Sequence, residues 1–577
     1  MILHSLARDA RDELIIGVLA LAAARWKFWT HHLGQVERQL TRLASRPRRC
    51  LAVLFLSSIA IRLALLPLIP VPKPLYHDEF SYLFGADTFA AGRLTNPLPP
   101  VPAAFETIHV NTGPTWQSMY LPGTSLALAA GEKLGLAWLA VLFITAAFCA
   151  SIYWMVSAWL PRRYALIAAS IAILVVYNGN WWFDNYFCLG LPCLGGALVL
   201  GSVPRVLRSR RLDSAGLLGL GLVILMLTRP YEGFVFSLPL VLVLAWSMRR
   251  RRWQAIAARA AVILAMVGSA FAWLCYYNAR GTGHALLFPY MLNYRDYHIT
   301  GPFLFSRMRP IPHYDVESMR RFYTNWEIPE HYWAASHPLT FLSTKIEVYY
   351  QSFLFGFGAL LLLGLAIVAL HSLRRRRVRL FAAPLLAFAA FALELVIMGW
   401  YPFPQYGAAA SSLFFLLIAF GLYALRRIRL PRWSRDGVAL SRGVAFAEIV
   451  IALSLFWKVW LYASVPPQPL NTSVERPRIE GILEREPGRQ LCLVRYSAGH
   501  VPREEWIFNQ ANLARADIVW ARSLTPETDE KLIEAFPNRR VWLLQPDRDD
   551  ADELTPYPGT QREMARLTLG PPIGRGR

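Results

Sequence analysis

The sequence predicts a polytopic α-helical membrane protein that ends in a small α/β domain. Of its 577 residues, 55% are hydrophobic and only 17% are charged, whereas ordinary soluble proteins carry about 25% charged residues. The apolar residues come in blocks of about 20, the length of helix that crosses the hydrocarbon core of a membrane. After residue 465 these blocks stop, and short strand-like segments replace them.

Eleven apolar blocks predict eleven transmembrane helices. The third and fifth blocks are short, which predicts tilted helices or helices broken near functional backbone. The predicted spans are residues 51–71, 136–160, 164–178, 186–204, 214–228, 231–248, 257–279, 347–371, 380–400, 405–425 and 442–464.

The first 50 residues are predicted to form a cytoplasmic or interfacial segment. Residues 14–24 are apolar, but Arg25 and Lys27 cut the run short. Acidic residues precede this run and no small-residue cleavage site follows it, which argues against a cleavable signal peptide. We expect an interfacial helix here, with a spanning helix as the alternative.

Arginine clusters in the short loops predict the orientation in the membrane. The formal net charge is +22, and clusters such as 46–49, 205–211, 249–252 and 374–377 fall in alternate loops. Cytoplasmic loops carry this excess of basic residues, so the N-terminus is predicted inside and, after an odd number of spans, the C-terminus outside. Nucleic-acid binding is not expected, because no basic face with interleaved aromatics lies outside the apolar region. We expect a bacterial inner membrane, with the endoplasmic reticulum as the alternative.

Two outer loops are long enough to carry function. Residues 72–135 and 280–346 are rich in aromatic and polar residues, and long loops of this kind in compact domains are usually functional. We expect short helices in them that lie along the membrane surface. With the spans, these loops make up a membrane domain over residues 51–465.

The tail, residues 466–577, is predicted to be a soluble outer α/β domain. Segments 489–496, 516–523 and 539–546 have the pattern of buried strands. Residues 525–536 have the pattern of a helix capped by Thr525, and strand–helix–strand order favours parallel pairing. The six cysteines form no disulfide pattern, and Cys492 is expected to be a small core residue of the first strand.

The segment after the first span holds the strongest chemical signal. "YHDEFSYLFGADTFAAGRLTNP" (76–97) begins with two adjacent carboxylates, Asp78 and Glu79, and is expected to form a short helix with Asp78 and Tyr82 on one face. A carboxylate at the rim of an apolar cavity suits a general base, because desolvation raises its pKa toward neutrality. The alternative is that both acids cap a surface helix.

Two short motifs in the first outer loop resemble those of a known superfamily. "HDE" (77–79) directly after the first span and "YLPG" (120–123) before the next helix resemble the GT-C membrane glycosyltransferases. The greatest similarity is to the branch of protein mannosyltransferases and lipid A aminoarabinose transferases, glycosyltransferase family 39 and relatives. The resemblance covers residues 50–465 and rests on motif position and topology.

The resemblance implies a function and two catalytic residues. It implies inverting transfer of a sugar from a polyprenyl-phosphate donor to a hydroxyl of a protein, lipid or glycan acceptor at the outer face. It places Asp78 as the base and Glu79 as its orienting partner. It also implies one or two spans beyond eleven. The tail is then expected to cover the active-site face or to recognise the acceptor, since it lacks a glycine-rich nucleotide fingerprint.

Arg229 is predicted to lie at an outer helix end, in "LTRPYEG" (227–233). Arginines near a span usually face an interior cavity or a partner, and the guanidinium fork suits a phosphate. Pro230 and Gly233 are expected to break the helix and expose backbone amides that can also meet an anion. The alternatives are a salt bridge to Glu232 and snorkelling to the interface.

Other polar residues complete the predicted site. Arg295 is a lipid-phosphate candidate, and His298 is a candidate for orienting the acceptor. Glu106 and His109 stand three apart, a spacing that allows them to share a helix face. Two ligands do not make a metal site, so a structural hydrogen bond is expected here in preference to a metal pair. No metal site and no cofactor are predicted. The predicted substrate- and lipid-phosphate-binding residues are Tyr82, Arg93, Glu106, His109, Tyr120, Arg229 and Arg295.

Three further candidates for the site lie in or between the later spans. The aromatic residues of "YPFPQYG" (401–407) are expected to lie at the membrane interface. The alternative is that Gln405 and Tyr406 line a sugar pocket. Glu394 lies inside a predicted span, where an acid is a functional candidate by default. No specific role is assigned to it.

Two other classes of protein remain as alternatives. A multi-pass transporter or lipid flippase often shows paired broken helices in two halves, and no such pairing is visible. A polysaccharide polymerase or ligase is expected to carry its main loop later in the chain. The acidic pair in the first outer loop favours the glycosyltransferase.

Overall fold

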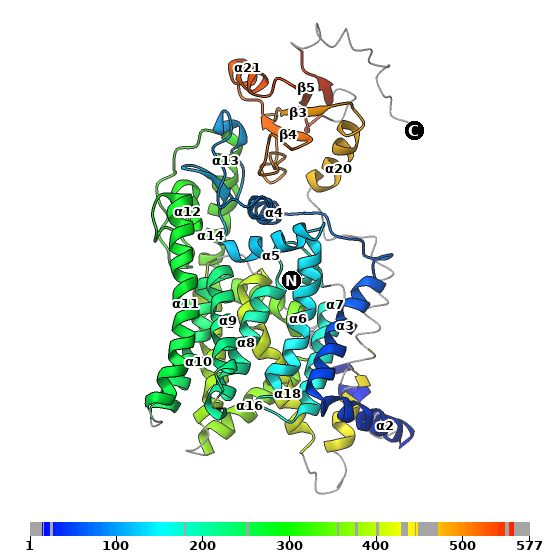
Figure 1. Cartoon of the computed structure of the whole chain (residues 1–577). Helices are drawn as coiled ribbons and strands as arrows, with labels where there is room; N and C mark the ends of the chain where they lie inside the picture. Colours follow the sequence, from blue (N-terminus) through cyan, green and yellow to red (C-terminus); the bar gives the residue numbers. More distant parts are fainter. Residues whose placement is uncertain are drawn as a thin grey trace.

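The computed structural model is mainly helical and carries a small sheet at one end (Figure 1). It describes residues 14–15, 17–22, 27–177, 180–209, 211–249, 253–354, 357–374, 379–399, 403–427, 437–444, 446–447, 450, 471–548 and 553–558.

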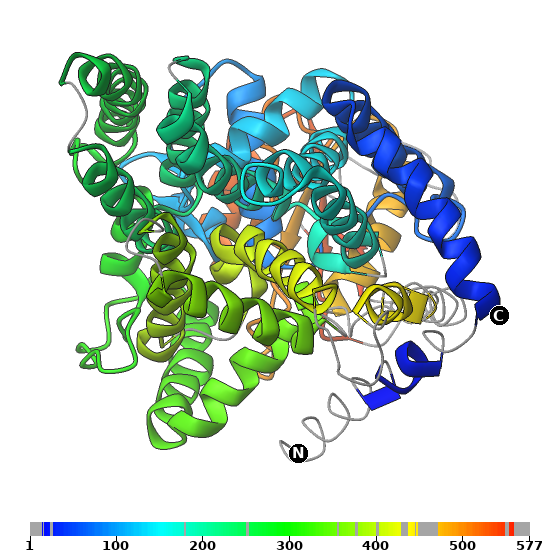
Figure 2. The ribbon, with the colours of Figure 1, turned by 90° about the horizontal axis from the view of Figure 1, so that it is seen from below.

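A bundle of long helices forms the body of the protein. Viewed from below, α3 lies along one edge of the bundle and α11 at the opposite edge (Figure 2). Its helices are α2 (Lys27–Ala44), α3 (Pro47–Ala64), α6 (Trp138–Val156), α7 (Arg162–Tyr177), α8 (Gly190–Arg208), α9 (Asp213–Thr228), α10 (Pro230–Met248), α11 (Trp253–Thr282), α15 (Pro338–Tyr349), η4 (Tyr350–Leu354), α16 (Gly358–Arg374), η5 (Arg379–Phe381), α17 (Ala382–Ile397) and α18 (Ala408–Leu425).

Several of these helices are suited to crossing a membrane. Among the described residues, five are long and apolar enough to do so: Trp138–Val156, Gly190–Arg208, Pro230–Met248, Ile256–Thr282 and Pro404–Leu425. Asp213–Thr228 and Ala382–Ile397 are apolar but shorter. The protein is therefore an integral membrane protein.

The predicted spans correspond to helices wherever the structure describes them, with one correction. Residues 347–371 are not a single straight helix, because Pro338–Leu354 and Gly358–Ser372 meet at 95°. Most of the predicted span 442–464 lies outside the described residues. The total of eleven spans stays a prediction.

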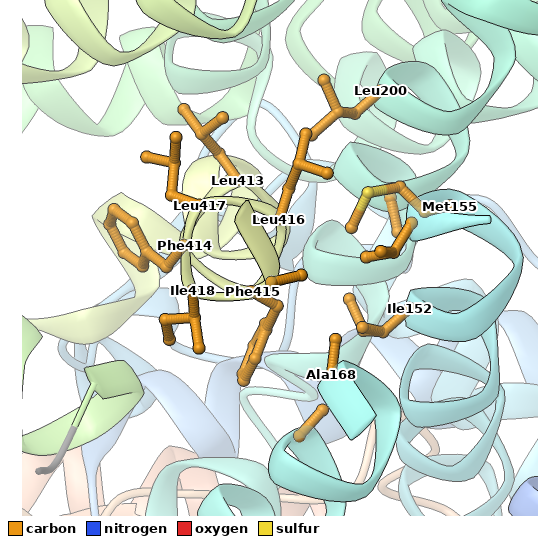
Figure 3. Close-up of a cluster of buried hydrophobic side chains, with 14 of the residues drawn as sticks. Ile152, Met155, Ala168, Leu200, Leu413, Phe414, Phe415, Leu416, Leu417 and Ile418 are labelled. Carbon is orange, nitrogen blue, oxygen red and sulfur yellow. The ribbon is translucent and has the colours of Figure 1, made fainter. Parts of the chain in front are cut away.

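The core of the bundle surrounds α18. Its apolar residues point to all sides and are buried against side chains of α6, α7 and α8, including Met155, Ala168 and Leu200 (Figure 3). A helix that is apolar all round belongs inside a bundle. A Cβ atom at Gly364 of α16 would lie 1.8 Å from the carbonyl oxygen of Leu417, so glycine permits the close approach of α16 to α18.

A buried ion pair fixes the end of α3, from which the first long loop departs. Arg62 Nε donates to Asp184 Oδ1 at 2.9 Å, and its other nitrogens donate to the carbonyls of Ile69 and Pro70. Trp138 Nε1 also donates to Asp184. The pair and its hydrogen bonds therefore hold the chain that leads into the next helix.

The two long loops form short helices, as expected, and one hairpin that was not expected. The hairpin pairs β1 (Val110–Thr112) antiparallel with β2 (Trp116–Ser118). In the first loop they are α4 (His77–Ala90), η1 (Pro102–Phe105) and α5 (Pro122–Lys133), and in the second they are α12 (Pro289–Tyr297), α13 (Glu317–Phe322), η3 (Tyr323–Glu327) and α14 (Ile328–Ser336). Two further short turns, η2 (Trp181–Phe183) and η6 (Pro404–Gly407), lie in other loops.

The described tail, residues 471–548 and 553–558, is called the C-terminal unit below. It holds a four-stranded sheet of order β4-β3-β5-β6, in which β3 pairs parallel with β4 and β5, as predicted, and β6 is antiparallel. Cys492 is buried in β3. The elements are α20 (Asn471–Leu483), β3 (Arg489–Val494), β4 (Ile518–Arg522), α21 (Pro526–Ala535), β5 (Arg539–Leu544) and β6 (Leu554–Pro556).

The C-terminal unit packs against α4 at one end of the bundle (Figure 1). His77 Nε2 lies 2.7 Å from the carbonyl oxygen of Arg503, and Phe80 stacks on Phe508 with ring centroids 4.2 Å apart. The amide of Ala511 donates to Asp87 at 2.6 Å. The C-terminal unit thus holds α4 on one face, both at its first turn and near its C-terminal end.

Candidate active site

A cavity of about 260 Å³ lies where α4, the break between α9 and α10, α12, η3 and the link before α18 meet. Its walls are largely aromatic, and they carry a small number of charged and polar side chains, as ligand pockets commonly do. The residues predicted from sequence that line it are Asp78, His109, Tyr120, Arg229, His298, Gln405 and Tyr406.

The two sequence motifs meet at a hydrogen bond in this cavity. The hydroxyl of Tyr120 donates to Asp78 Oδ1. Asp78 lies in the first turn of α4 on the face turned away from the C-terminal unit, and a quarter of its side chain is exposed. "HDE" and "YLPG" are 42 residues apart in the chain and form one constellation in space.

His109 is the third member of this constellation. Its Nδ1 lies 3.6 Å from Asp78 Oδ2 and 3.3 Å from the hydroxyl of Tyr120. Burial lowers the pKa of His109 to about 4, although the nearby Asp78 carboxylate opposes the change. The ring is therefore neutral at pH 7. His109 has φ of +65°, a left-handed conformation that is uncommon for residues other than glycine but is found more often for Asn, Asp and His.

We expect acid to destabilise the protein through His109. Its folded pKa lies below the ordinary value of 6.5, so the stability it contributes is complete above pH 6.5 and is lost as the pH falls through 4. The free energy of unfolding of wild type should exceed that of His109→Asn by less at pH 4.5 than at pH 7, and this excess should fall by up to about 3 kcal/mol. Thermal melts of both proteins at the two pH values measure the change. A difference independent of pH would contradict this assignment.

Arg229 lies on the cavity wall at the break between α9 and α10. Its Nη2 donates to the hydroxyl of Tyr82 at 3.4 Å, its Nη1 lies 3.9 Å from Glu232, and its guanidinium lies over the ring of Tyr406. The salt bridge proposed as an alternative is therefore present but long. The cation still faces the cavity.

Glycine in the second motif brings α5 up to this break. A Cβ atom at Gly123 would lie 2.6 Å from the carbonyl oxygen of Leu227 and 2.8 Å from the methyl group of Thr228. Both atoms belong to the last turn of α9, next to Arg229. Glycine at position 123 therefore lets Tyr120 and Arg229 share one cavity.

Glu79 faces away from the cavity and is completely buried. Its Oε2 accepts from the amides of Leu75 and Tyr76 at 2.8 and 3.1 Å, and its Oε1 accepts from the amide of Tyr186 at 3.1 Å. Burial raises the pKa of Glu79 to about 7, and the three donors oppose that rise. Glu79 thus caps α4 and ties it to the loop before α8.

We expect Glu79→Ala to destabilise the fold. The substitution leaves three amides without their acceptor in a buried place, and each such loss costs about 1–3 kcal/mol. A thermal unfolding scan of the detergent-solubilised protein should show a clear decrease in melting temperature. An unchanged melting temperature would contradict the role of Glu79 as a cap.

The second long loop adds a buried contact between a histidine and a glutamate that the sequence did not reveal. His298 Nδ1 lies 3.1 Å from Glu327 Oε1, and the backbone of Ile299 and the hydroxyl of Thr300 also donate to this carboxylate. Burial tends to raise the pKa of Glu327, but these bonds hold it below the ordinary value. Glu327 had no sequence signal, because its partners precede it by 27 to 29 residues.

Four of the predicted substrate- and lipid-phosphate-binding residues do not line the cavity. Tyr82 supports it from behind, since its ring stacks on Tyr120 at 4.3 Å. Arg93 lines another cavity. Arg295 is mostly exposed and pairs with Asp296 at 2.7 Å. Glu106 is buried, and burial raises its pKa.

The structure shows the surroundings of two acidic residues that were candidates in the sequence, Glu106 and Glu394. Glu106 and His109 do not share a helix face, because η1 ends at Phe105 and residues 106–109 are not helical. Glu394 is buried in α17 outside the cavity lining, and nearby Lys345 donates instead to the carbonyls of Leu395 and Met398. Within the described ranges, no three His, Cys, Asp or Glu side chains are grouped to hold a metal.

Solved structures with a similar arrangement include two membrane transferases. One is ArnT from Cupriavidus metallidurans bound to undecaprenyl phosphate, with 12% identity over 90% of this chain and 95% of that chain and a TM-score of 0.49. Another is the oligosaccharyltransferase AglB from Archaeoglobus fulgidus with an inhibitory peptide and a dolichol-phosphate, with 12% identity over 86% of this chain and 69% of that chain and a TM-score of 0.48.

Both proteins belong to the GT-C superfamily, which the two loop motifs resemble. No family model and no curated protein matches this chain. Similarity at this level assigns no residue and no substrate, so the function proposed next depends on the geometry of the site.

Proposed function

We propose that the protein is a membrane glycosyltransferase that moves a sugar from a polyprenyl-phosphate donor to an acceptor hydroxyl. The observation that carries the proposal is that Asp78 and Arg229 line one cavity at the end of apolar helices. A carboxylate suits the proton of the acceptor hydroxyl. A guanidinium suits the phosphate of the donor. Aromatic walls between apolar helices suit the adjoining sugar and lipid.

The proposed reaction is a single displacement. The acceptor oxygen attacks the anomeric carbon of the donor while Asp78 takes the hydroxyl proton. The bond between the anomeric carbon and the phosphate oxygen breaks, and polyprenyl phosphate leaves with the bonding electrons. Arg229 stabilises the negative charge that develops on the leaving phosphate. Attack opposite the leaving group inverts the anomeric configuration.

Hydrogen-bond partners favour Asp78 over Glu79 as the base. Asp78 is partly exposed to the cavity, and Tyr120 and His109 hold its carboxylate in place. Glu79 has both oxygens occupied by backbone amides and no access to the cavity. Glu79 therefore positions α4, and with it Asp78.

We also propose the topology and the role of the C-terminal unit. The arginine pattern of the short loops supports a topology in which the cavity and this unit lie at the outer face of the membrane. Arg522 of the C-terminal unit donates to the carbonyl of Glu106 at 2.8 Å, three residues before His109. The unit thus supports both α4 and the segment before β1 that carries His109, as a cover over the first long loop.

Turnover by the purified, lipid-reconstituted protein tests the proposal. A panel of polyprenyl-phosphate pentoses and hexoses would be supplied with lipid, peptide and glycan acceptors, and release of free polyprenyl phosphate would be measured. Release with inversion at the anomeric carbon supports the proposal. If no donor is consumed but the protein moves lipid between leaflets, the flippase alternative replaces it.

A further inference from the structure

A second cavity lies beyond the other end of α4, between the first long loop and the C-terminal unit. Its volume is about 420 Å³. Arg93, which follows the last turn of α4, lines it together with Arg489 and Arg539 of the C-terminal unit. Asp78 lies in the first turn of α4. The two cavities are therefore about 20 Å apart along this helix, at 1.5 Å per residue.

Among the described residues, no carboxylate lines this cavity or forms an ion pair with its arginines. Arg489 Nη1 donates to the carbonyl of Ala514 at 2.7 Å, and Arg539 Nη2 donates to that of Leu513 at 2.6 Å. Neither arginine forms an ion pair with a described residue. Burial and the neighbouring Arg489 lower the pKa of Arg539, although Asp517 opposes this at longer range. The two guanidinium groups thus repel each other beside one cavity.

Arg93 adds a third cation with unused donors. Its Nε and Nη2 atoms are buried, and neither has a hydrogen-bond partner among the described residues. A buried guanidinium donor without an acceptor costs free energy in the empty protein. A ligand oxygen that accepted from these donors would remove that cost.

The remaining walls offer polar groups and flat surfaces. Trp116 is buried and lines the cavity, and its indole Nε1–H has no partner among the described residues. Asn512 and Asn538 add amides, and prolines add apolar faces. Such a wall suits a hydroxylated ring better than a bare ion.

We propose that this cavity binds a phosphorylated sugar. A phosphate monoester carries a charge of about −1.5 to −2 and three acceptor oxygens. It therefore balances the charge of up to three guanidinium groups, and accepts their hydrogen bonds, better than a single carboxylate does. The sugar ring occupies the space beside Trp116 and the two asparagines. This binding does not depend on the proposed transfer reaction.

Calorimetric titration of the full-length protein with glucose 1-phosphate, inorganic phosphate and glucose tests the proposal. The background variant is Arg229→Gln, which removes the cation of the first cavity. We expect glucose 1-phosphate to bind more tightly than phosphate, and glucose not to bind. Arg93→Gln and Arg489→Gln should each weaken binding at least about tenfold, the loss that a charge-assisted hydrogen bond supplies.

Arg485→Gln is the matched control, because Arg485 is an exposed arginine of the C-terminal unit outside this cavity. It should leave the affinity unchanged. Arg93→Gln should not lower the melting temperature of the ligand-free protein, since its buried donors have no partner to lose. Absence of phosphate binding, or equal affinity in all variants, overturns the site. Equal affinity for phosphate and glucose 1-phosphate overturns the recognition of the sugar.

Discussion

Asp78→Asn is expected to abolish sugar transfer while leaving donor binding intact. Asparagine retains an oxygen that accepts from the hydroxyl of Tyr120, so the loop should keep its shape. It cannot accept the proton of the acceptor hydroxyl, and loss of a general base costs about 10²–10⁴-fold in rate. The measurement is single-turnover transfer in lipid bilayers, with donor binding measured separately by equilibrium dialysis.

The neighbouring carboxylate supplies the control for this experiment. Glu79→Gln keeps an acceptor for the amides that cap α4 and should retain most transfer activity per folded molecule. If Asp78→Asn transfers sugar as well as wild type, or Glu79→Gln loses as much activity, the assignment of the base is wrong. A simultaneous loss of donor binding in Asp78→Asn would instead indicate a role in substrate placement.

Arg229→Gln is expected to impair both donor binding and turnover. The guanidinium faces the cavity, and removing a charge-assisted contact to phosphate should weaken donor affinity about tenfold or more. Loss of charge stabilisation on the leaving phosphate should lower turnover by about 10²-fold. Arg229→Lys retains the charge without the fork and should lie between wild type and Arg229→Gln.

Arg295→Gln is the matched comparison for this prediction. Arg295 is exposed, pairs with Asp296 and lies outside the cavity lining, so donor affinity should not change. Equal effects of the two substitutions would show that general surface charge, and not the cavity, governs donor binding. Melting temperatures of both variants separate such an effect from unfolding, because Arg229 also compensates buried Glu232.

Local sequence patterns predicted the elements of the fold well. The apolar blocks marked the helices because about 20 apolar residues have one stable arrangement in a membrane. The strands of the C-terminal unit and the cap at Thr525 were likewise local signals, and Thr525 does accept from the amide of Thr528. The hairpin at 110–118 escaped prediction, because its strands are only three residues long and lack alternation.

The residues of the site that lie in short sequence motifs were predictable, whereas contacts between distant parts of the chain were not. Asp78, Tyr120 and Arg229 lie in short motifs whose chemistry is visible in sequence. The contact of His298 with Glu327, and the position of Arg93 at another cavity, depend on residues far apart in the chain. The division of roles between Asp78 and Glu79 required the hydrogen bonds of the three-dimensional structure, since adjacent residues of a helix differ only in the side to which they point.

The packing of the C-terminal unit on α4 affects how the protein matures. His77 and Arg503, which meet in this contact, are 426 residues apart. Translation proceeds from the N-terminus at about 5–20 residues per second, so α4 leaves the ribosome tens of seconds before the segment that covers it. During that time the helix with Asp78 has one uncovered face. The cavity that Asp78 lines therefore gains the support of the C-terminal unit only after the final segment of the chain has been made.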